Sequence, residues 1–142
     1  MSASSRPNIV FFIADDHGQT ESGAYGNPVV RTPNIDRLAR EGMRFTRAFT
    51  ASPQCAPSRT VIATGLYPYR NGCHPNHASV RPGVRTLPSY FAEIGYRVVL
   101  EGKTHMAPHE AFPFEGTWDG RHFSPERIDA LFANPGDKPF FL

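Results

Sequence analysis

The run Asn8–Ala14 constrains the fold of this chain more than any other stretch. It is apolar almost throughout, and two carboxylates, Asp15 and Asp16, follow it directly. A short run that is apolar on both faces is typical of a strand inside a parallel sheet, which helices cover on each side. We therefore expect an α/β fold, with Asp15 and Asp16 at the carboxyl edge of the sheet, where such sheets bind ligands.

The order of the other predicted elements supports the same fold class. Proline and glycine punctuation, together with apolar periodicity, predicts four helices and three further strands. The helices are expected over 33–41, 57–64, 87–94 and 125–133, and the strands over 44–50, 96–100 and from 138 onward. Strands that alternate with helices in this way predict an α/β sandwich with a mostly parallel sheet.

Length and composition set the outer bounds. The chain has 142 residues, a hydrophobic share of 39% and a formal net charge of +2, which together indicate one soluble domain. This charge is too small to indicate nucleic acid or a membrane surface as a partner. The longest apolar stretch, residues 9–14, is too short to span a membrane and lacks the pattern of a signal peptide. As written, the chain is expected in the cytoplasm, or in the periplasm or outside the cell if an export segment precedes it.

The stretch Cys55–Gly65 carries the most specific chemistry. A cysteine precedes Pro57-Ser58-Arg59, and a short run then leads to Thr64-Gly65. Proline suits the first turn of a helix and glycine suits its end, so Cys55 is expected beside a helix N-terminus. Free N–H groups there favour an anion, and Arg59 lies about one turn further on. The stretch predicts a site for sulfate or phosphate with a reactive group at its rim.

Other polar residues follow predicted strands. Lys103 and His105 come after the strand over 96–100 and would project in the same direction from extended backbone. The alternative is an ordinary basic loop. Asp15 and Asp16 repel each other unless a cation lies between them, and their hard oxygen ligands suit Ca²⁺ or Mg²⁺. The alternative for this pair is a solvated turn.

The remaining histidines and cysteines favour simpler interpretations. His74 and His77 are three residues apart, but no partner of matching spacing exists. We therefore interpret them as loop histidines rather than metal ligands. Cys55 and Cys73 are compatible with one structural disulfide, which would exclude a reactive role for Cys55.

Four stretches together resemble the sulfatase family. Cys55–Gly65 resembles its signature, Cys-x-Pro-Ser-Arg followed by a short run and Thr-Gly. Residues 8–16 resemble the family's first strand and paired aspartates, and residues 32–45 resemble the helix and strand before the cysteine. Residues 102–105 resemble its Gly-Lys-x-His. Within the family, the shorter stretches 21–25, 103–108 and 112–114 look most like the heparan N-sulfatase (sulfamidase) branch.

This resemblance implies an alkaline-phosphatase-like sandwich and a hydrolase of sulfuric esters or sulfamates. Cys55 would be oxidised to formylglycine by a formylglycine-generating enzyme. Asp15 and Asp16 would bind Ca²⁺, with Mg²⁺ as the alternative, together with the formylglycine oxygen at position 55. Arg59 would hold the hydrated aldehyde, Lys103 would contact the sulfate, and His105 would transfer a proton. The substrate would be a sulfated small molecule or glycan.

The resemblance also bears on domain organisation. Residues 1–6 are expected to form a flexible leader, and residues 7–142 the N-terminal portion of a sulfatase catalytic domain. The family's later Asp-Asn metal ligands, and a further His and Lys or Arg, would lie beyond Leu142. We therefore expect the 142 residues alone to bind metal poorly and to turn over little substrate.

Two alternatives to a sulfatase stay open at this point. The first is a phosphonate or phosphate ester hydrolase of the same superfamily, which can share the cysteine motif. The second is a non-catalytic α/β module in which Cys55 and Cys73 are structural. The chemical state of Cys55 separates the second alternative from both enzymes.

Overall fold

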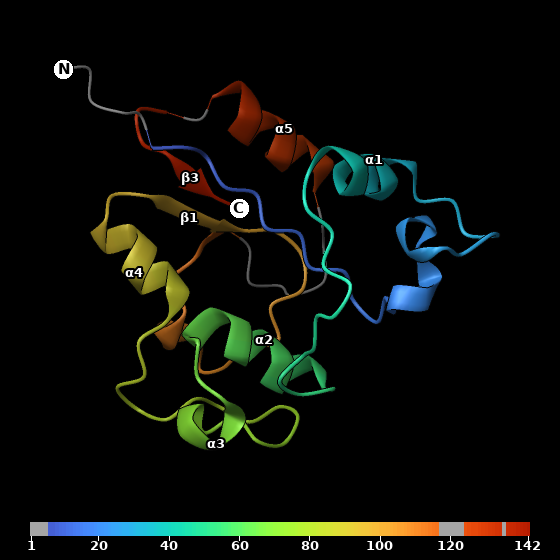
Figure 1. The fold of residues 1–142 in the computed structure, drawn as a ribbon. Helices are drawn as coiled ribbons and strands as arrows, with labels where there is room; N and C mark the ends of the chain where they lie inside the picture. Colours follow the sequence, from blue (N-terminus) through green and yellow to red (C-terminus); the bar gives the residue numbers. More distant parts are fainter. Residues whose placement is uncertain (1–5, 117–123, 135) are drawn as a thin grey trace. The chain divides into compact units, whose positions relative to one another are not determined.

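A computed structural model describes residues 6–116, 124–134 and 136–142 (Figure 1). The predicted leader therefore lies outside the described residues, apart from Arg6. The chain divides into two compact units. The first unit comprises Met1–Phe12 and Thr50–Leu142, and the second comprises Ile13–Phe49.

A parallel sheet forms the centre of the first unit. Its strands are β1 (Arg97–Leu100), β2 (Glu115–Gly116) and β3 (Phe140–Phe141), in the spatial order β2-β1-β3. β1 pairs in parallel with both neighbours. The predicted α/β class with a parallel sheet is therefore confirmed, and so are the strands β1 and β3. The sequence did not predict β2.

Helices accompany this sheet in the first unit. Those described are α2 (Cys55–Thr64), α3 (Pro68–Asn71), α4 (Leu87–Glu93), α5 (Pro125–Ala133) and the 3-10 turn η3 (His109–Ala111). The predicted helices corresponding to α2, α4 and α5 are confirmed. The sequence did not predict the single turn of helix α3. Among the described residues, no helix has the length and apolar character needed to cross a membrane.

Helices α4 and α5 cover opposite faces of the sheet. Phe140 and Phe141 are adjacent in β3, so their side chains point to opposite faces. On one face, Phe140 packs with Val99 and Leu131, and the latter belongs to α5. On the other face, the rings of Phe141 and Phe91 of α4 lie 4.7 Å apart. This arrangement is the helix–sheet–helix layering of an α/β sandwich (Figure 1).

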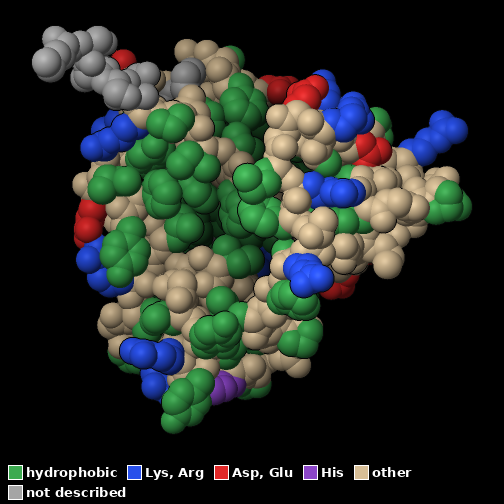
Figure 2. All heavy atoms as spheres, in the orientation of Figure 1, with side chains coloured by type: hydrophobic (Ala, Val, Ile, Leu, Met, Phe, Trp, Pro, Cys, Tyr) green, Lys and Arg blue, Asp and Glu red, His purple; other side chains and the backbone are tan. Residues whose placement is uncertain are grey.

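The predicted first strand over 8–14 is wrong as a strand. The segment runs beside β3, where Ile9 N–H donates to the Phe140 carbonyl at 2.8 Å and Ile9 bridges Phe141 in parallel. Val10 and Phe12 are 57% and 77% exposed, so the expected burial on both faces is also absent. Figure 2 shows hydrophobic side chains gathered where Figure 1, in the same orientation, draws β1, β3 and α4. Leu142 N–H also donates to the Ile9 carbonyl and Phe11 N–H to the Leu142 carbonyl, so the pairing among the described residues is limited to the start of the segment.

Helix α2 rests on a second apolar cluster. Ala63 of α2 is buried with Val80 and Phe112, and residues such as Met106 pack around them. Phe112 is fully buried. Because Val80 and Met106 belong to the loops that follow α3 and β1, this cluster brings those two loops against α2.

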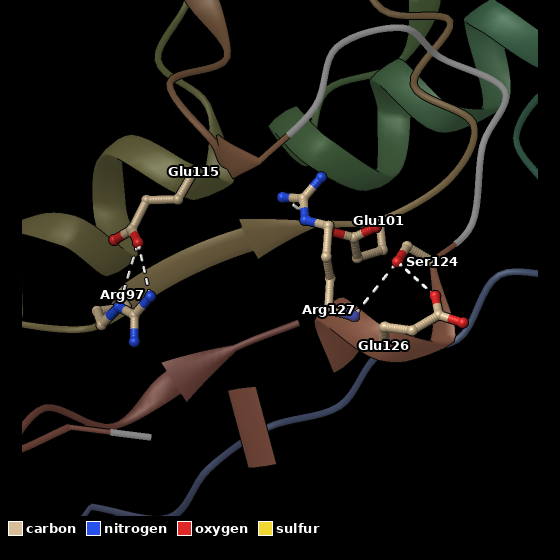
Figure 3. A network of polar contacts seen from close by, with 6 residues as sticks. All are labelled: Arg97, Glu101, Glu115, Ser124, Glu126 and Arg127. Carbon is tan, nitrogen blue, oxygen red and sulfur yellow. Dashed lines mark hydrogen bonds and ion pairs between the residues drawn. The ribbon is translucent and has the colours of Figure 1, made fainter. Parts of the chain in front are cut away.

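An ion pair secures the chain where β1 ends. Glu101 directly follows β1, and its side chain is only 4% exposed. Its Oε1 lies 3.0 Å from Nη2 of Arg127 in α5 (Figure 3). Ser124 caps α5, as its Oγ accepts the Arg127 N–H at 3.3 Å. The same hydroxyl donates to Glu126 at 3.0 Å. Backbone and Ser124 hydrogen bonds hold the pKa of Glu126 below its ordinary value. The ion pair between Glu101 and Arg127 thus ties the start of the segment that carries Lys103 to helix α5.

The second unit is built around α1 (Pro33–Glu41) and two short 3-10 turns, η1 (Gln19–Glu21) and η2 (Gly23–Tyr25). The predicted helix over 33–41 is confirmed. Thr32 stands at its N-cap position, and its hydroxyl accepts the Gly23 N–H at 2.9 Å while donating to Asp36 at 2.8 Å. Asp36 packs so closely on Gly23 that an added Cβ would lie 2.8 Å from its carboxylate. These contacts join the loop to the helix.

The predicted strand over 44–50 is wrong. The described residues 44–50 form no strand. Phe45 is 64% exposed and Phe49 89% exposed. The alternation that predicted a strand placed Arg47 on the same face as both phenylalanines, so the face was never apolar throughout. An extended segment without a neighbouring strand has no ladder to stabilise it.

Candidate active site

Cys55 is the first residue of helix α2. The preceding residue, Gln54, has extended backbone at the N-cap position. The helix therefore begins two residues earlier than predicted, and Pro57 occupies its third position. A proline is tolerated there because the first N–H groups of a helix have no partner within it. The helix ends as predicted, at Gly65, whose φ of 67° favours glycine.

The residues of α2 differ in how deeply they are buried. Ala56, Pro57, Arg59 and Thr60 are buried, while Cys55 is half-buried. Arg59 is 9% exposed although it carries a guanidinium. A buried charge of this kind needs hydrogen-bond partners, and Nη1 of Arg59 donates to the carbonyl oxygen of Lys103 at 3.0 Å.

The N-terminus of α2 is capped from outside the helix. The Ala56 N–H donates to Oδ1 of Asn76 at 3.1 Å. Asn76 is twenty residues further along the chain, in the loop after α3. One of the N–H groups that we expected to face an anion is thus taken by a side-chain amide.

Lys103 lies beside the cysteine. Its Nζ is 3.5 Å from Sγ of Cys55, and its carbonyl accepts the hydrogen bond from Arg59. The segment after β1 therefore brings a cation to the first residue of α2 and receives a second cation at its backbone. The ammonium of Lys103 next to a half-buried sulfur favours an anionic ligand at this place.

His105 contacts a second histidine, His77. Its Nε2 lies 2.8 Å from Nδ1 of His77, and the ring centroids are 4.5 Å apart. The backbone of His105 is left-handed, with φ of 53°. The extended backbone that we assumed for residues 103–105 is therefore absent at His105, so the rule of alternating side chains does not apply there.

Asp15 and Asp16 belong to the second unit. Both are exposed, and Asp16 has a left-handed φ of 51°. Adjacent carboxylates with hard oxygen donors suit Ca²⁺ or Mg²⁺ in chemical type.

Both cysteines are free thiols. Cys73 is fully buried, and its Sγ donates to the Ala78 carbonyl oxygen at 3.1 Å. The structural disulfide that the two cysteines could have formed is therefore absent.

The Sulfatase family model matches residues 7–142. The chain belongs to the sulfatase family. It is 39% identical over 146 residues to an ulvan-active sulfatase of Formosa agariphila. It is also 32% identical over 154 residues to the human N-sulphoglucosamine sulphohydrolase. These alignments cover 98% and 97% of this chain but only 29% and 31% of the two relatives.

Solved structures with a similar fold agree with this family assignment. One is a protein in complex with its substrate D-glucosamine-2-N,6-O-disulfate, with a TM-score of 0.81 and 28% identity over 96% of this chain and 33% of that one. Another is the phosphonate monoester hydrolase of Agrobacterium radiobacter, with a TM-score of 0.69 and 29% identity over 82% and 25%. The predicted alkaline-phosphatase-like fold is confirmed, and membership of the family implies a metal ion and a formylglycine in general.

Sequence reasoning missed two residues beside the candidate active site, Asn76 and His77. His77 does lie in a loop, as we interpreted it, but the sequence did not predict its contact with His105. Neither residue stands in a motif that we could read. A weak signal was present in the loop itself, because Asn76 and His77 are polar residues between the buried Cys73 and Val80.

Proposed function

We propose that this sulfatase hydrolyses sulfuric esters or sulfamates with a nucleophile derived from Cys55. The observation that carries the proposal is the 3.5 Å approach of Lys103 Nζ to Cys55 Sγ in a member of the sulfatase family. The approach gives the cysteine of the motif a cationic neighbour at the place where a sulfate group must bind.

The residues present fit the modification that the family implies. Cys55 is a free, half-buried thiol at the start of a helix, and oxidation at its Cβ would put oxygen where Sγ now lies. A formylglycine-generating enzyme would make this change. When hydrated, the aldehyde supplies the oxygen nucleophile, and a divalent cation supplies charge neutralisation. We assign Asp15 and Asp16, with position 55, as ligands of that cation, and Ca²⁺ as its identity.

The chain's own cations have separate tasks in this proposal. Lys103 binds the sulfate oxygens and compensates the charge that develops on them. Arg59 holds the group at position 55 from within its own helix, while its hydrogen bond to the Lys103 carbonyl fixes the backbone that carries that lysine. His105 exchanges the proton that leaving group and nucleophile require, which suits an imidazole near neutral pH.

We further propose a sulfated glycan as substrate. One relative acts on ulvan by its name, and another is named for N-sulphoglucosamine. A solved structure with a similar fold holds a glucosamine sulfated on nitrogen and oxygen. These names support a sulfated sugar, and the sulfamidase branch suggested by residues 21–25 makes an N-sulfate the first substrate to test.

A second candidate is a phosphonate or phosphate ester hydrolase. The similarity to the phosphonate monoester hydrolase favours it, since that protein shares the fold at 29% identity. Tetrahedral anions of sulfur and phosphorus make similar demands on Arg59 and Lys103. Relative rates on matched sulfate and phosphonate esters separate the two candidates.

We infer that residues 7–142 supply the N-terminal portion of the catalytic domain, because the alignments to both relatives cover less than a third of their lengths. The decisive experiment compares Cys55→Ala with Cys73→Ala in the longest natural form of the protein, expressed with a formylglycine-generating enzyme. Cys55→Ala should lose more than about 10³-fold in kcat/KM, because it removes the nucleophile.

Mass spectrometry completes this test. The peptide with position 55 should carry an aldehyde in the parent protein and in Cys73→Ala, which keeps the motif intact. An unmodified thiol at position 55 in a fully active enzyme would refute the proposal. The 142-residue chain, assayed alongside, should show little or no turnover.

A further inference from the structure

His77 has a place in the structure that the proposed function does not use. It lies in the loop between α3 and α4, and its Nδ1 is 2.8 Å from Nε2 of His105. The two rings are tilted by 54°, with centroids 4.5 Å apart. We propose that His77 is a positioning residue, which fixes the ring orientation and the tautomer of His105. The catalytic consequence rests on the proposed function, whereas the contact does not.

The hydrogen bond couples the two tautomers. A neutral imidazole carries one N–H and one bare nitrogen, so a single proton lies between Nε2 of His105 and Nδ1 of His77. If His105 donates from Nε2, its Nδ1 is the basic nitrogen. If His105 accepts at Nε2, its own proton lies on Nδ1 instead. The tautomer of His77 therefore fixes that of His105. A bare Nδ1 on His77 leaves Nδ1 of His105 as the basic nitrogen, whereas a protonated Nδ1 on His77 leaves the His105 proton on Nδ1 and occupies its basic Nε2.

The backbone at both ends of this contact is unusual. His77 has φ of 68° and His105 has φ of 53°. Left-handed backbone is uncommon for residues other than glycine, and surrounding structure must hold it in place. Two such residues facing each other across 28 positions indicate that the fold maintains this meeting of the two rings.

The loop that carries His77 is anchored on both sides of it. On one side, Asn76 binds the Ala56 N–H, next to Cys55. On the other side, the Val80 N–H donates to the Ala107 carbonyl at 2.7 Å, two residues beyond His105. His77 is thus tied to the segment of the nucleophile and to the segment of the proton-transfer group. This arrangement suits a residue that sets the position of one relative to the other.

The backbone conformation dictates which variants test the proposal. Glycine and asparagine both accept a left-handed φ, so neither substitution strains the loop. His77→Gly removes the hydrogen bond, whereas His77→Asn keeps a polar amide near the position of Nδ1. His74→Gly is the matched control, because His74 lies in the same loop but packs on Tyr69, with centroids 5.6 Å apart.

Steady-state kinetics on the full-length enzyme give the first readout. We expect His77→Gly to lower kcat by about 10- to 100-fold, by analogy with residues that orient metal-binding histidines, with KM within about twofold. His77→Asn should recover most of the loss, and His74→Gly should match the parent enzyme. A kcat for His77→Gly equal to that of the parent would overturn the proposal.

Nitrogen NMR of histidine-labelled enzyme gives a second readout that needs no substrate. The His105 ring nitrogens should shift in His77→Gly, as the tautomer loses its partner, and should stay in place in His74→Gly. Unchanged His105 shifts in His77→Gly would overturn the positioning role. If the shifts change but the parent enzyme cleaves no sulfate ester, the contact stands and the proposed function fails.

Discussion

Helix α2 and the loop over residues 73–81 both contribute to the candidate active site, but they are held in place differently. In α2, the residues around the site are buried, and Ala63 packs into the cluster with Val80 and Phe112. In the loop, Asn76 and His77 are exposed and reach the site through single hydrogen bonds. The helix is thus placed by packing, and the loop by individual polar contacts.

This difference separates stability from activity. A substitution in α2 removes packing and chemistry together, so it should lower both the free energy of unfolding and the rate. A substitution in the loop removes a single hydrogen bond and leaves the packing around the loop intact, so it should lower the rate more than the free energy of unfolding. The base of the loop is fixed at Gly72, where a Cβ would lie 2.6 Å from the side chain of Arg81. Variants in the two regions test this contrast.

The largest combined effect is expected at Arg59. Arg59→Ala should lower kcat/KM by about 10²–10³-fold, the loss typical for one charge-stabilising donor. It should also lower the free energy of unfolding by about 1–3 kcal/mol, because the Lys103 carbonyl loses its donor in a buried setting. Kinetics on a sulfate ester and urea unfolding measure the two losses.

Two further variants sharpen the test at Arg59. Arg59→Lys keeps the charge but not the planar fork, so it should recover part of the stability and little of the rate. Arg70→Ala removes an exposed arginine of α3 and should leave both quantities unchanged. An Arg59→Ala enzyme that loses rate at full stability would contradict the expectation that a substitution in α2 lowers stability and rate together.

Local sequence signals predicted α2 because they are contained within it. Proline in the first turn, the glycine end and the cysteine motif are read from eleven consecutive residues. The same holds for α1, α4 and α5, where a proline opens and an apolar face follows. The parallel sheet was predictable because its strands alternate with these helices.

The loop was not predictable, because its role depends on residues far away in sequence. His77 meets His105 across 28 positions, and Asn76 meets Ala56 across 20. No spacing rule links such pairs in a single sequence. The error over residues 8–14 has a related cause, since an apolar run predicts burial but does not say which elements provide the cover.

A moderate effect is expected at Asn76. Asn76→Ala leaves the buried Ala56 N–H without its acceptor, so it should lower the free energy of unfolding by about 1 kcal/mol, as the loss of a helix cap does. Asn76→Asp keeps the acceptor and should recover this stability. Its negative charge would repel an anionic substrate and raise KM. Thermal unfolding and substrate titration separate these two consequences, and an Asn76→Ala protein of full stability would show that the cap is unimportant.

The smallest effect is expected at an exposed contact outside the site, which sets the baseline for the comparison. The guanidinium of Arg85 donates to the carboxylate of Glu93, and the two side chains are 49% and 62% exposed. This hydrogen bond holds the pKa of Glu93 below its ordinary value and raises that of Arg85. A carboxyl with a lowered pKa stabilises the fold above its unfolded pKa and loses this effect as the pH falls through the folded pKa.

Solvent screens such a pair, so Glu93→Gln should leave the melting temperature at pH 7 indistinguishable from that of the parent protein. Any difference should be present only above the ordinary pKa of a glutamate and should vanish in acid. Glu110→Gln, at another exposed glutamate, is the matched control. A loss at Glu93 as large as the loss at Asn76 would show that exposed polar contacts hold this fold generally, and the contrast between α2 and the loop would then lose its basis.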